Sequence, residues 1–141
     1  MRNLIIIIAF NFLFLKPVYS LIEVDITRGN LDPLPIAVSP LHVDIKSEEF
    51  KDLRIKVLGE NISKIIERNF RSTGLFNPLK KDAFVQKPDI AHLKPRFEDW
   101  RLIKAQALVT GKILIRDGKL KVEFRLWDLA AAKEMNALAF T

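Results

Sequence analysis

The sequence predicts an α+β domain in which a small mixed or antiparallel sheet packs against two helices, preceded by an extended N-terminal arm. A stripe of apolar residues at helical spacing begins at Phe50, and alternating apolar residues follow the dipeptide Asp117-Gly118. Prolines and glycines separate these segments. Helices that pack on an antiparallel or mixed sheet define the α+β class.

Residues 1–20 are predicted to be a secretory signal peptide. A basic residue follows Met1, an apolar block runs from Leu4 to Leu15, and Val18-Tyr19-Ser20 precedes the expected cleavage site. This order is typical of a signal peptide, and the block is shorter than the roughly 20 apolar residues that span a membrane. An uncleaved anchor is the alternative. We expect a mature chain of residues 21–141 with no transmembrane helix and, since no Cys follows the block, no lipoprotein anchor.

The composition of the mature chain indicates one exported domain with a mixed surface. Its length suits a single compact domain. It contains no Cys, which fits the bacterial periplasm at least as well as the extracellular space. Lys and Arg are interleaved with Asp and Glu, and the longest basic run is Lys80-Lys81. Nucleic-acid patches contain about five to eight basic residues in a cluster, so no nucleic-acid partner is expected.

Two short apolar segments open the mature chain. Residues from Leu21 to Thr27 alternate between apolar and polar side chains, which is the period of a strand with one apolar face. A second run extends from Leu34 to Val38, with Pro33 before it and Pro35 inside it. Because proline removes a backbone donor, this run is predicted to be an edge strand or an extended arm rather than a central strand.

A long amphipathic helix is the next predicted element. Its apolar stripe consists of Phe50, Leu53, Val57, Leu58, Ile62, Ile65, Ile66 and Phe70. Spacings of three and four residues place these side chains on one helical face. Gly74 follows at a position where a helix can end through a left-handed residue. A loop with several prolines is then expected up to Pro95.

The last third of the chain predicts a short helix and three strands. The helix is expected from Phe97 to Ala105, and a buried strand from Ala107 to Arg116. Asp117-Gly118 is a strong two-residue hairpin signal, because both positions must accept positive φ. On the return strand we expect four inward-facing residues, Leu120, Val122, Phe124 and Leu126, with Lys119, Lys121, Glu123 and Arg125 outward. A final strand is predicted from Met135 to Phe140.

Residues that could carry catalysis or bind metal are scarce. His42 and His92 both fall in predicted loops, far apart in sequence, with no companions at metal-ligand spacing. Every glycine stands alone, so no phosphate-binding loop can form. Glu98-Asp99 is expected to complement the dipole of a helix start, and Trp100 and Trp127 are expected in the core or an interface. We therefore predict a non-enzymatic interaction domain without catalytic residues, metal or cofactor.

Several blocks of the chain resemble the N-terminal domain of the TolB family, which belongs to the Tol–Pal envelope system. In order, they are Leu21 to Gly29 with Pro33 to Val38, Arg71 to Phe76, Phe97 to Arg101, Ala105 to Gly111, and Leu120 to Asp128. The blocks keep the family order and cover nearly the whole mature chain. The resemblance implies a periplasmic domain that supports outer-membrane integrity, cell division and protein import.

The resemblance also implies a binding site. In the family the mature N-terminus is recognised by the C-terminal domain of TolA, which links it to TolQ and TolR. The matching residues are Leu21, Ile22, Glu23, Val24, Asp25, Ile26, Thr27, Arg28 and Gly29, within an expected arm of residues 21–33. An alternating peptide of this kind can add as a strand to the sheet edge of a partner. The alternative is that the same residues form an edge strand of their own domain.

The chain departs from the family in one large respect. TolB carries a β-propeller after this domain, and the propeller is the main docking surface for the lipoprotein Pal, whereas this sequence stops at Thr141. Binding of Pal is therefore not carried over, and the sequence leaves open whether the chain is a fragment or a stand-alone protein. Two other functions also remain open. One is a periplasmic regulator of cell-wall synthesis with the same small fold, and the other is a small enzyme or ligand-binding domain.

Overall fold

The computed structural model describes residues 32–45, 57–116 and 119–141, which form an α+β domain and confirm the predicted fold class. The strands are β1 (Leu34–Val38), β2 (His42–Ile45), β3 (Phe76–Pro78), β4 (Ala107–Arg116), β5 (Lys119–Asp128) and β6 (Lys133–Phe140). The helices are α3 (Leu58–Ser72), α4 (Pro88–Ala91), α5 (Phe97–Leu102) and the 3-10 turn η2 (Lys81–Ala83). The predicted signal peptide and residues 21–31 of the predicted arm lie outside the described residues.

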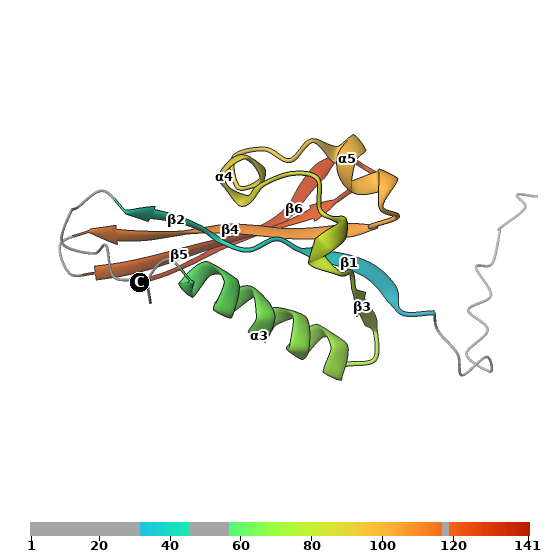
Figure 1. Ribbon diagram of the computed structural model, residues 1–141, viewed down its shortest axis with the longest axis horizontal. Coiled ribbons are helices and arrows are strands. Elements are labelled where there is room, and N and C mark those ends of the chain that lie inside the picture. The colour runs from blue at the N-terminus through green and yellow to red at the C-terminus, as the bar shows by residue number, and fades with distance from the viewer. Residues whose placement is uncertain (1–31, 46–56, 117–118) are drawn as a thin grey trace, which may run out of the picture. The chain divides into compact units, whose positions relative to one another are not determined.

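One mixed sheet organises the domain. Its strand order is β3-β1-β4-β5-β6, and β2 pairs with β4 beyond the end of β1 (Figure 1). Strand β1 runs parallel to both β3 and β4, whereas β4, β5 and β6 form an antiparallel meander. Strands β1 and β2 use successive parts of β4, with Ile36 opposite Ala107 and His42 opposite Lys112. The long strand β4 is therefore the centre of the sheet.

The prediction that residues 34–38 form an edge strand or an arm is wrong, because β1 lies inside the sheet. Pairing of β1 with β4 begins at Ile36, one residue after Pro35, so the missing donor of Pro35 falls before this ladder starts. The carbonyl oxygen of Pro35 still accepts a hydrogen bond from the backbone N–H of Gln106, at 2.9 Å. Proline is tolerated in a strand at such a position.

Helix α3 confirms the second half of the predicted long helix, while residues 46–56 lie outside the described ranges. The apolar stripe of α3 faces the sheet through Leu58, Ile62, Ile66 and Phe70. A side chain at Gly59 would collide with the carbonyl oxygen of Leu41. Glycine at this position therefore allows α3 to pack closely against the backbone of Leu41. Gly74, with φ of 71°, follows the C-cap as the predicted left-handed residue.

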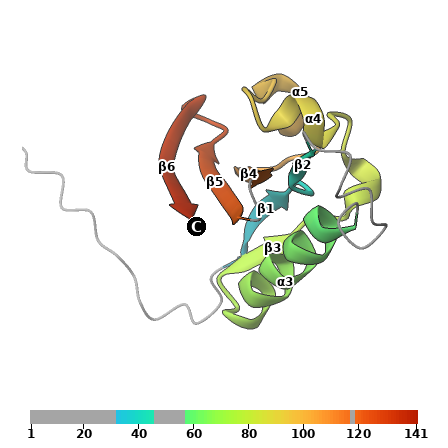
Figure 2. The ribbon, with the colours of Figure 1, turned by 90° about the vertical axis from the view of Figure 1, so that its left-hand side faces the viewer.

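The two faces of the sheet carry different cover (Figure 2). On one face α3 packs on two apolar clusters, centred on Ile36 and Ile113. On the other face α4, α5 and η2 enclose a third cluster, which contains Trp100, Trp127 and Leu108. Both tryptophans are buried, as predicted for core residues.

The predicted hairpin is confirmed by the pairing of its strands. Arg116 lies opposite Lys119, so two residues, which lie outside the described ranges, connect β4 to β5. Leu120, Val122, Phe124 and Leu126 face the side of α3, but only Val122 is buried, and Leu120 is 43% exposed. The prediction that these residues share one face of the strand is confirmed, but this face is less buried than was predicted.

The predicted proline-containing loop contains regular structure. It includes β3, η2 and α4, and His42 lies on β2 rather than in a loop. Gln86 anchors this segment, since its Oε1 accepts hydrogen bonds from the Trp100 indole N–H at 2.9 Å and the Arg96 backbone N–H at 3.0 Å. Short elements of three or four residues have too little periodicity to be predicted from a single sequence.

Candidate interaction surface

The predicted binding residues, Leu21 to Gly29, lie outside the described part of the chain, so their placement stays a prediction. The described domain shows where they join it. Asp32 and Pro33 are exposed, and the first hydrogen bond with the sheet region runs from the Leu34 N–H to the Leu75 carbonyl oxygen, at 2.9 Å. The predicted binding residues thus end five positions before β1 begins.

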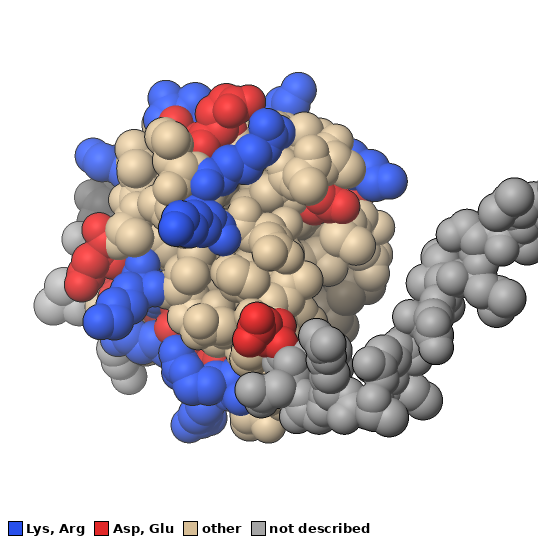
Figure 3. All heavy atoms as spheres, turned by 90° about the vertical axis from the view of Figure 1, so that its right-hand side faces the viewer, with Lys and Arg blue, Asp and Glu red and all other residues tan. Residues whose placement is uncertain are grey.

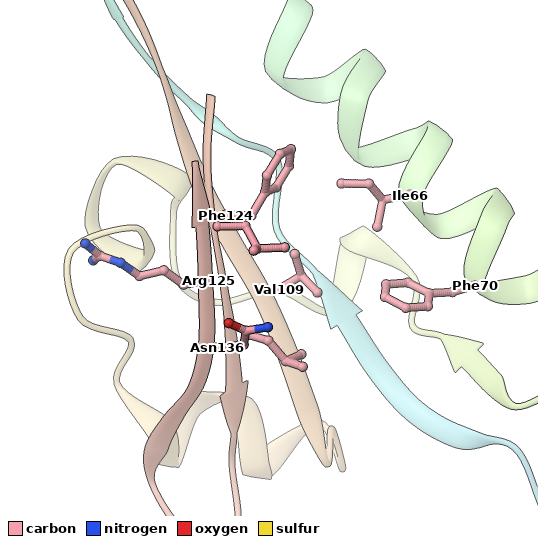
Figure 4. A pocket seen from close by; sticks show the side chains of 8 residues that line it. Ile66, Phe70, Val109, Phe124, Arg125 and Asn136 are labelled. Atoms are coloured by element: carbon pink, nitrogen blue, oxygen red, sulfur yellow. The ribbon is translucent and has the colours of Figure 1, made fainter. Parts of the chain in front are cut away.

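An apolar groove of about 310 Å³ lies between α3 and strands β5 and β6 (Figure 4). Its lining residues are Ile66, Phe70, Val109, Phe124, Arg125, Leu126, Asn136 and Leu138. Arg125 contributes little charge to the groove, because its side chain points away from it and forms a salt bridge with Glu134 at 3.5 Å. The groove therefore presents almost only hydrocarbon, with the Asn136 amide as its polar group.

The groove is open because a single helix covers only part of this face of the sheet. Figure 2 shows α3 beside β1 and β3, while β5 and β6 lie away from it. Leu138 and Phe140, on the exposed side, are 54% and 58% accessible to solvent. Contiguous exposed apolar residues of this kind mark interaction surfaces on proteins.

Strand β6 adds a second feature to the same surface. All eight of its residues are exposed, and it pairs only with β5 within the described residues. Between Met135 and Phe140 it contains neither a charged residue nor a proline. Native proteins usually protect a sheet edge with such residues, because unpaired backbone groups on an edge accept another strand. Neither the groove nor this edge was predicted from the sequence.

The charged residues do not gather into a basic patch on the face drawn in Figure 3. Lys and Arg side chains there stand singly or in small groups, with acidic and uncharged residues between them. Two of the basic residues on the sheet, Lys112 and Lys121, both form salt bridges with Glu123, at 3.2 and 2.9 Å. Hydrogen bonding by Lys121 lowers the pKa of Glu123, with Lys112 acting in the same direction.

The acidic pair at the start of α5 has a structural role. Asp99 forms a salt bridge with Arg96 at 2.6 Å, and Glu98 forms one with Arg101 at 3.1 Å. Both acids lie in the first turn of the helix, where negative charge complements the dipole. Each carboxylate therefore has a partner that explains it without catalysis.

The two histidines that are distant in sequence meet in the structure. The rings of His42 and His92 stack, with centroids 4.3 Å apart and an angle of 5° between their planes. Parallel rings at this separation cannot both aim a nitrogen at one metal ion at the usual 2.0–2.1 Å, because metal bonds lie near the ring plane. Within the described residues no group of three potential metal ligands occurs.

Fold and surface together define a small α+β domain whose accessible features, an apolar groove and an open strand, suit binding to other polypeptides. Comparison with known proteins assigns the family. Residues 22–135 match the family described as the TolB amino-terminal domain, and the chain belongs to it. Family membership confirms the predicted resemblance and the prediction that the chain is not an enzyme.

A curated relative is similar over most of the chain. The Tol-Pal system protein TolB of Pelagibacter ubique (strain HTCC1062) is 67% identical over 125 residues, which cover 87% of this chain and 28% of the relative. The chain thus spans less than a third of the length of that relative. TolB proteins of the Tol–Pal system are periplasmic, which supports the predicted compartment, and within the described ranges no helix has the length and apolarity to cross a membrane.

Solved structures share the fold at low sequence identity. TolB from Acinetobacter baumannii gives a TM-score of 0.57 at 16% identity, covering 79% of this chain and 23% of that one. The LpoB C-terminal domain from Escherichia coli gives 0.55 at 8% identity, covering 80% of this chain and 86% of that domain. These likenesses establish the fold alone.

Proposed function

We propose that this chain is a periplasmic binding domain of the Tol–Pal system that captures the C-terminal domain of TolA through residues Leu21 to Gly29. Through TolA it would connect with TolQ and TolR. The single observation that carries the proposal is the family match, which begins at residue 22 and so includes all of these residues except Leu21. The high identity with a Tol-Pal system protein supports the same assignment.

The proposed contact is strand addition. In residues 21–27 apolar side chains alternate with polar ones, so a partner's sheet edge would bind the backbone and its pockets would take Ile22, Val24 and Ile26. The described domain begins its sheet pairing at Leu34, which leaves these residues N-terminal to the anchored strand. Affinity would come from main-chain hydrogen bonds, and specificity from the alternate side chains.

A pair of charge substitutions tests this mode of binding. Val24→Lys places a charge on the face that is proposed to enter the partner, whereas Glu23→Lys places the same charge on the opposite face. Calorimetric titration with the TolA C-terminal domain should show binding by the Glu23→Lys protein and a loss of about tenfold or more for Val24→Lys, because an unpaired charge would have to be desolvated. Equal effects of the two substitutions would contradict strand addition with this orientation.

Export is a further part of the proposal. We propose that the signal peptide of residues 1–20 is removed, so that Leu21 becomes the mature N-terminus next to the binding residues. Mass spectrometry of the periplasmic protein should then give a chain that begins at Leu21. A full-length form that stays in the membrane would contradict this step.

The proposed cellular role follows from the partner. A domain that binds TolA would support outer-membrane integrity, cell division and protein import. Binding of Pal is not part of this proposal, which concerns residues Leu21 to Gly29. A pull-down with the mature chain distinguishes this role from regulation of cell-wall synthesis, because recovery of a cell-wall enzyme without TolA would favour that alternative.

A further inference from the structure

Two histidines from different elements stack on the face of the sheet that carries α4 and α5. His42 belongs to β2, and His92 is the C-cap residue of α4. Their ring centroids are 4.3 Å apart and their planes differ by 5°. The stack therefore joins the segment around α4 to the edge of the sheet.

The hydrogen bonding of His92 identifies where it can accept a proton. Its Nδ1 lies 2.9 Å from the carbonyl oxygen of Pro88. A carbonyl oxygen only accepts hydrogen bonds, so Nδ1 carries the hydrogen and donates it. A second proton must then enter at Nε2, which would make the ring a cation while it stacks against His42.

The segment of residues 88–93 has few other connections to the sheet. Its backbone N–H groups bond locally, for example from Ala91 to Lys87 and from His92 to Pro88, at 3.0 and 3.2 Å. Ala91 is buried, but Ile90 and Leu93 are 47% and 66% exposed. Arg125 Nη1 donates to the carbonyl oxygens of His92 and Leu93, at 3.2 and 3.4 Å. Ala91, which packs in the cluster of Trp100 and Trp127, is the one buried residue of this segment, so the segment can open with the loss of a single small core side chain.

Charged groups of both signs surround the stack. The cations nearby are Lys87, Lys112 and Arg125, and the acids are Asp44, Glu60, Asp89 and Glu123. Glu123 is already bound to Lys112 and Lys121. Asp44 and Asp89 favour the first proton on the ring pair, but two cationic rings in stacking contact repel each other at short range, and Lys112 adds to that repulsion.

We propose that the stacked pair His42 and His92 is a pH-sensitive latch, which holds residues 88–93 against the sheet at neutral pH and releases them in mildly acidic medium. Release would expose the side of α4 around Ala91, which is buried in the closed state. The latch lies on the described domain and not in residues 21–29, so it can operate whether or not those residues bind TolA.

The direction of the pH effect follows from the environment of His42. Burial, and next the neighbouring His92, lower the pKa of His42 below its ordinary value of 6.5, and Asp44 and Asp89 only partly oppose this. A histidine with a lowered pKa favours the closed state while it is neutral. The contribution of His42 to the stability of the closed state is therefore complete above its ordinary pKa. This contribution is lost as the pH falls from the ordinary pKa toward the lowered one.

Amide hydrogen exchange in the mature protein tests the latch. Between pH 7.5 and pH 5.5 we expect the protection of the amides of Ala91 and His92, corrected for intrinsic exchange, to fall by about tenfold or more. Amides of β4 and β5 should keep their protection. Equal protection of the α4 amides at the two pH values would overturn the proposal.

Matched variants separate the latch from general acid sensitivity. His42→Gln should lose the pH dependence of the α4 amides, because only one ring remains to titrate. Lys94→Gln, which changes an exposed charge beside the segment, should keep it. Persistence of the pH dependence in His42→Gln would overturn the proposal. If that variant does not fold, ring titration by NMR decides: coupled titration with one ring below 6.5 supports the latch, and two independent rings at ordinary values contradict it.

Discussion

The two faces of the sheet use their large apolar residues in different ways. On the face of α4 and α5, Trp100 and Trp127 are 1% and 7% exposed, and each indole N–H has a buried acceptor. On the face of α3, Phe124 and Leu126 are only half-buried, and Leu138 is mostly exposed. The first face is closed by aromatic packing, while the second leaves an apolar groove open to solvent. The same sheet thus combines a stabilising face with a face suited to binding.

The aromatic contacts explain why one face closes. Phe84 packs edge-on against Trp100 at a centroid distance of 5.0 Å, and Phe97 packs in the same way against Trp127 at 5.9 Å. Aromatic pairs in this geometry contribute about 0.5–1.5 kcal/mol beyond the burial of their surface. Short helices can hold these rings because the sheet supplies the opposing wall. Stability should therefore depend more on the closed face than on the open one.

The largest expected effect is that of Trp100→Ala on the closed face. Removing this buried indole should lower the free energy of unfolding by about 3–5 kcal/mol, through lost burial and the cavity that remains. Urea unfolding followed by circular dichroism measures it. Phe124→Ala on the open face is the matched control and should cost less, since part of the ring is already in contact with water. Equal losses would show that the two faces do not differ in this way.

A smaller effect is expected from Trp127→Phe. This change keeps a ring in the core but leaves the buried hydroxyl of Thr110 without the indole donor, which lies 2.8 Å away. We expect a loss of about 1–3 kcal/mol in the same unfolding experiment. Adding Thr110→Val should restore part of the loss, because both polar partners are then absent. The explanation would be contradicted if the double variant lost more free energy of unfolding than the two single variants lose together.

The smallest effect on stability is expected from Leu138→Asn in the groove. Because Leu138 is 54% exposed, the free energy of unfolding should change by less than about 1 kcal/mol. Binding of an apolar fluorescent dye should nevertheless fall, as the groove loses an apolar wall. Ala139→Asn, on the opposite face of β6, is the control and should keep the dye signal. A large loss of stability with unchanged dye binding would mean that the groove is closed in solution.

The sequence predicted the closed face better than the open face. The hairpin of β4 and β5 was predicted because alternation and Asp117-Gly118 are local signals, and the burial of the tryptophans follows from their size. The exposure of Leu120 and the incomplete burial of Phe124 could not be predicted, because the period of a strand shows which face a residue occupies but not what covers that face.

Contacts between distant segments were missed for a similar reason. The stack of His42 on His92 depends on the packing of α4 beside β2, and neither element has enough residues to show a period. The internal position of β1 was missed because proline was taken as a sign of an edge, whereas Pro35 falls just before the ladder with β4. The predicted binding residues 21–29 were named only through resemblance to the family, since their alternation alone fits an edge strand of their own domain equally well.

The most direct test of the proposed function uses the mature chain without residues Leu21 to Ile26. Titration calorimetry with the C-terminal domain of TolA should show no binding by this shortened protein and clear binding by the complete mature chain. Its thermal unfolding, recorded on the same sample, should remain nearly unchanged, because the closed face and β1 are intact and a terminal segment adds little to a cooperative core. If the shortened protein stays folded and still binds TolA, the contact lies elsewhere, and if it unfolds, the deleted residues are a strand of the domain itself.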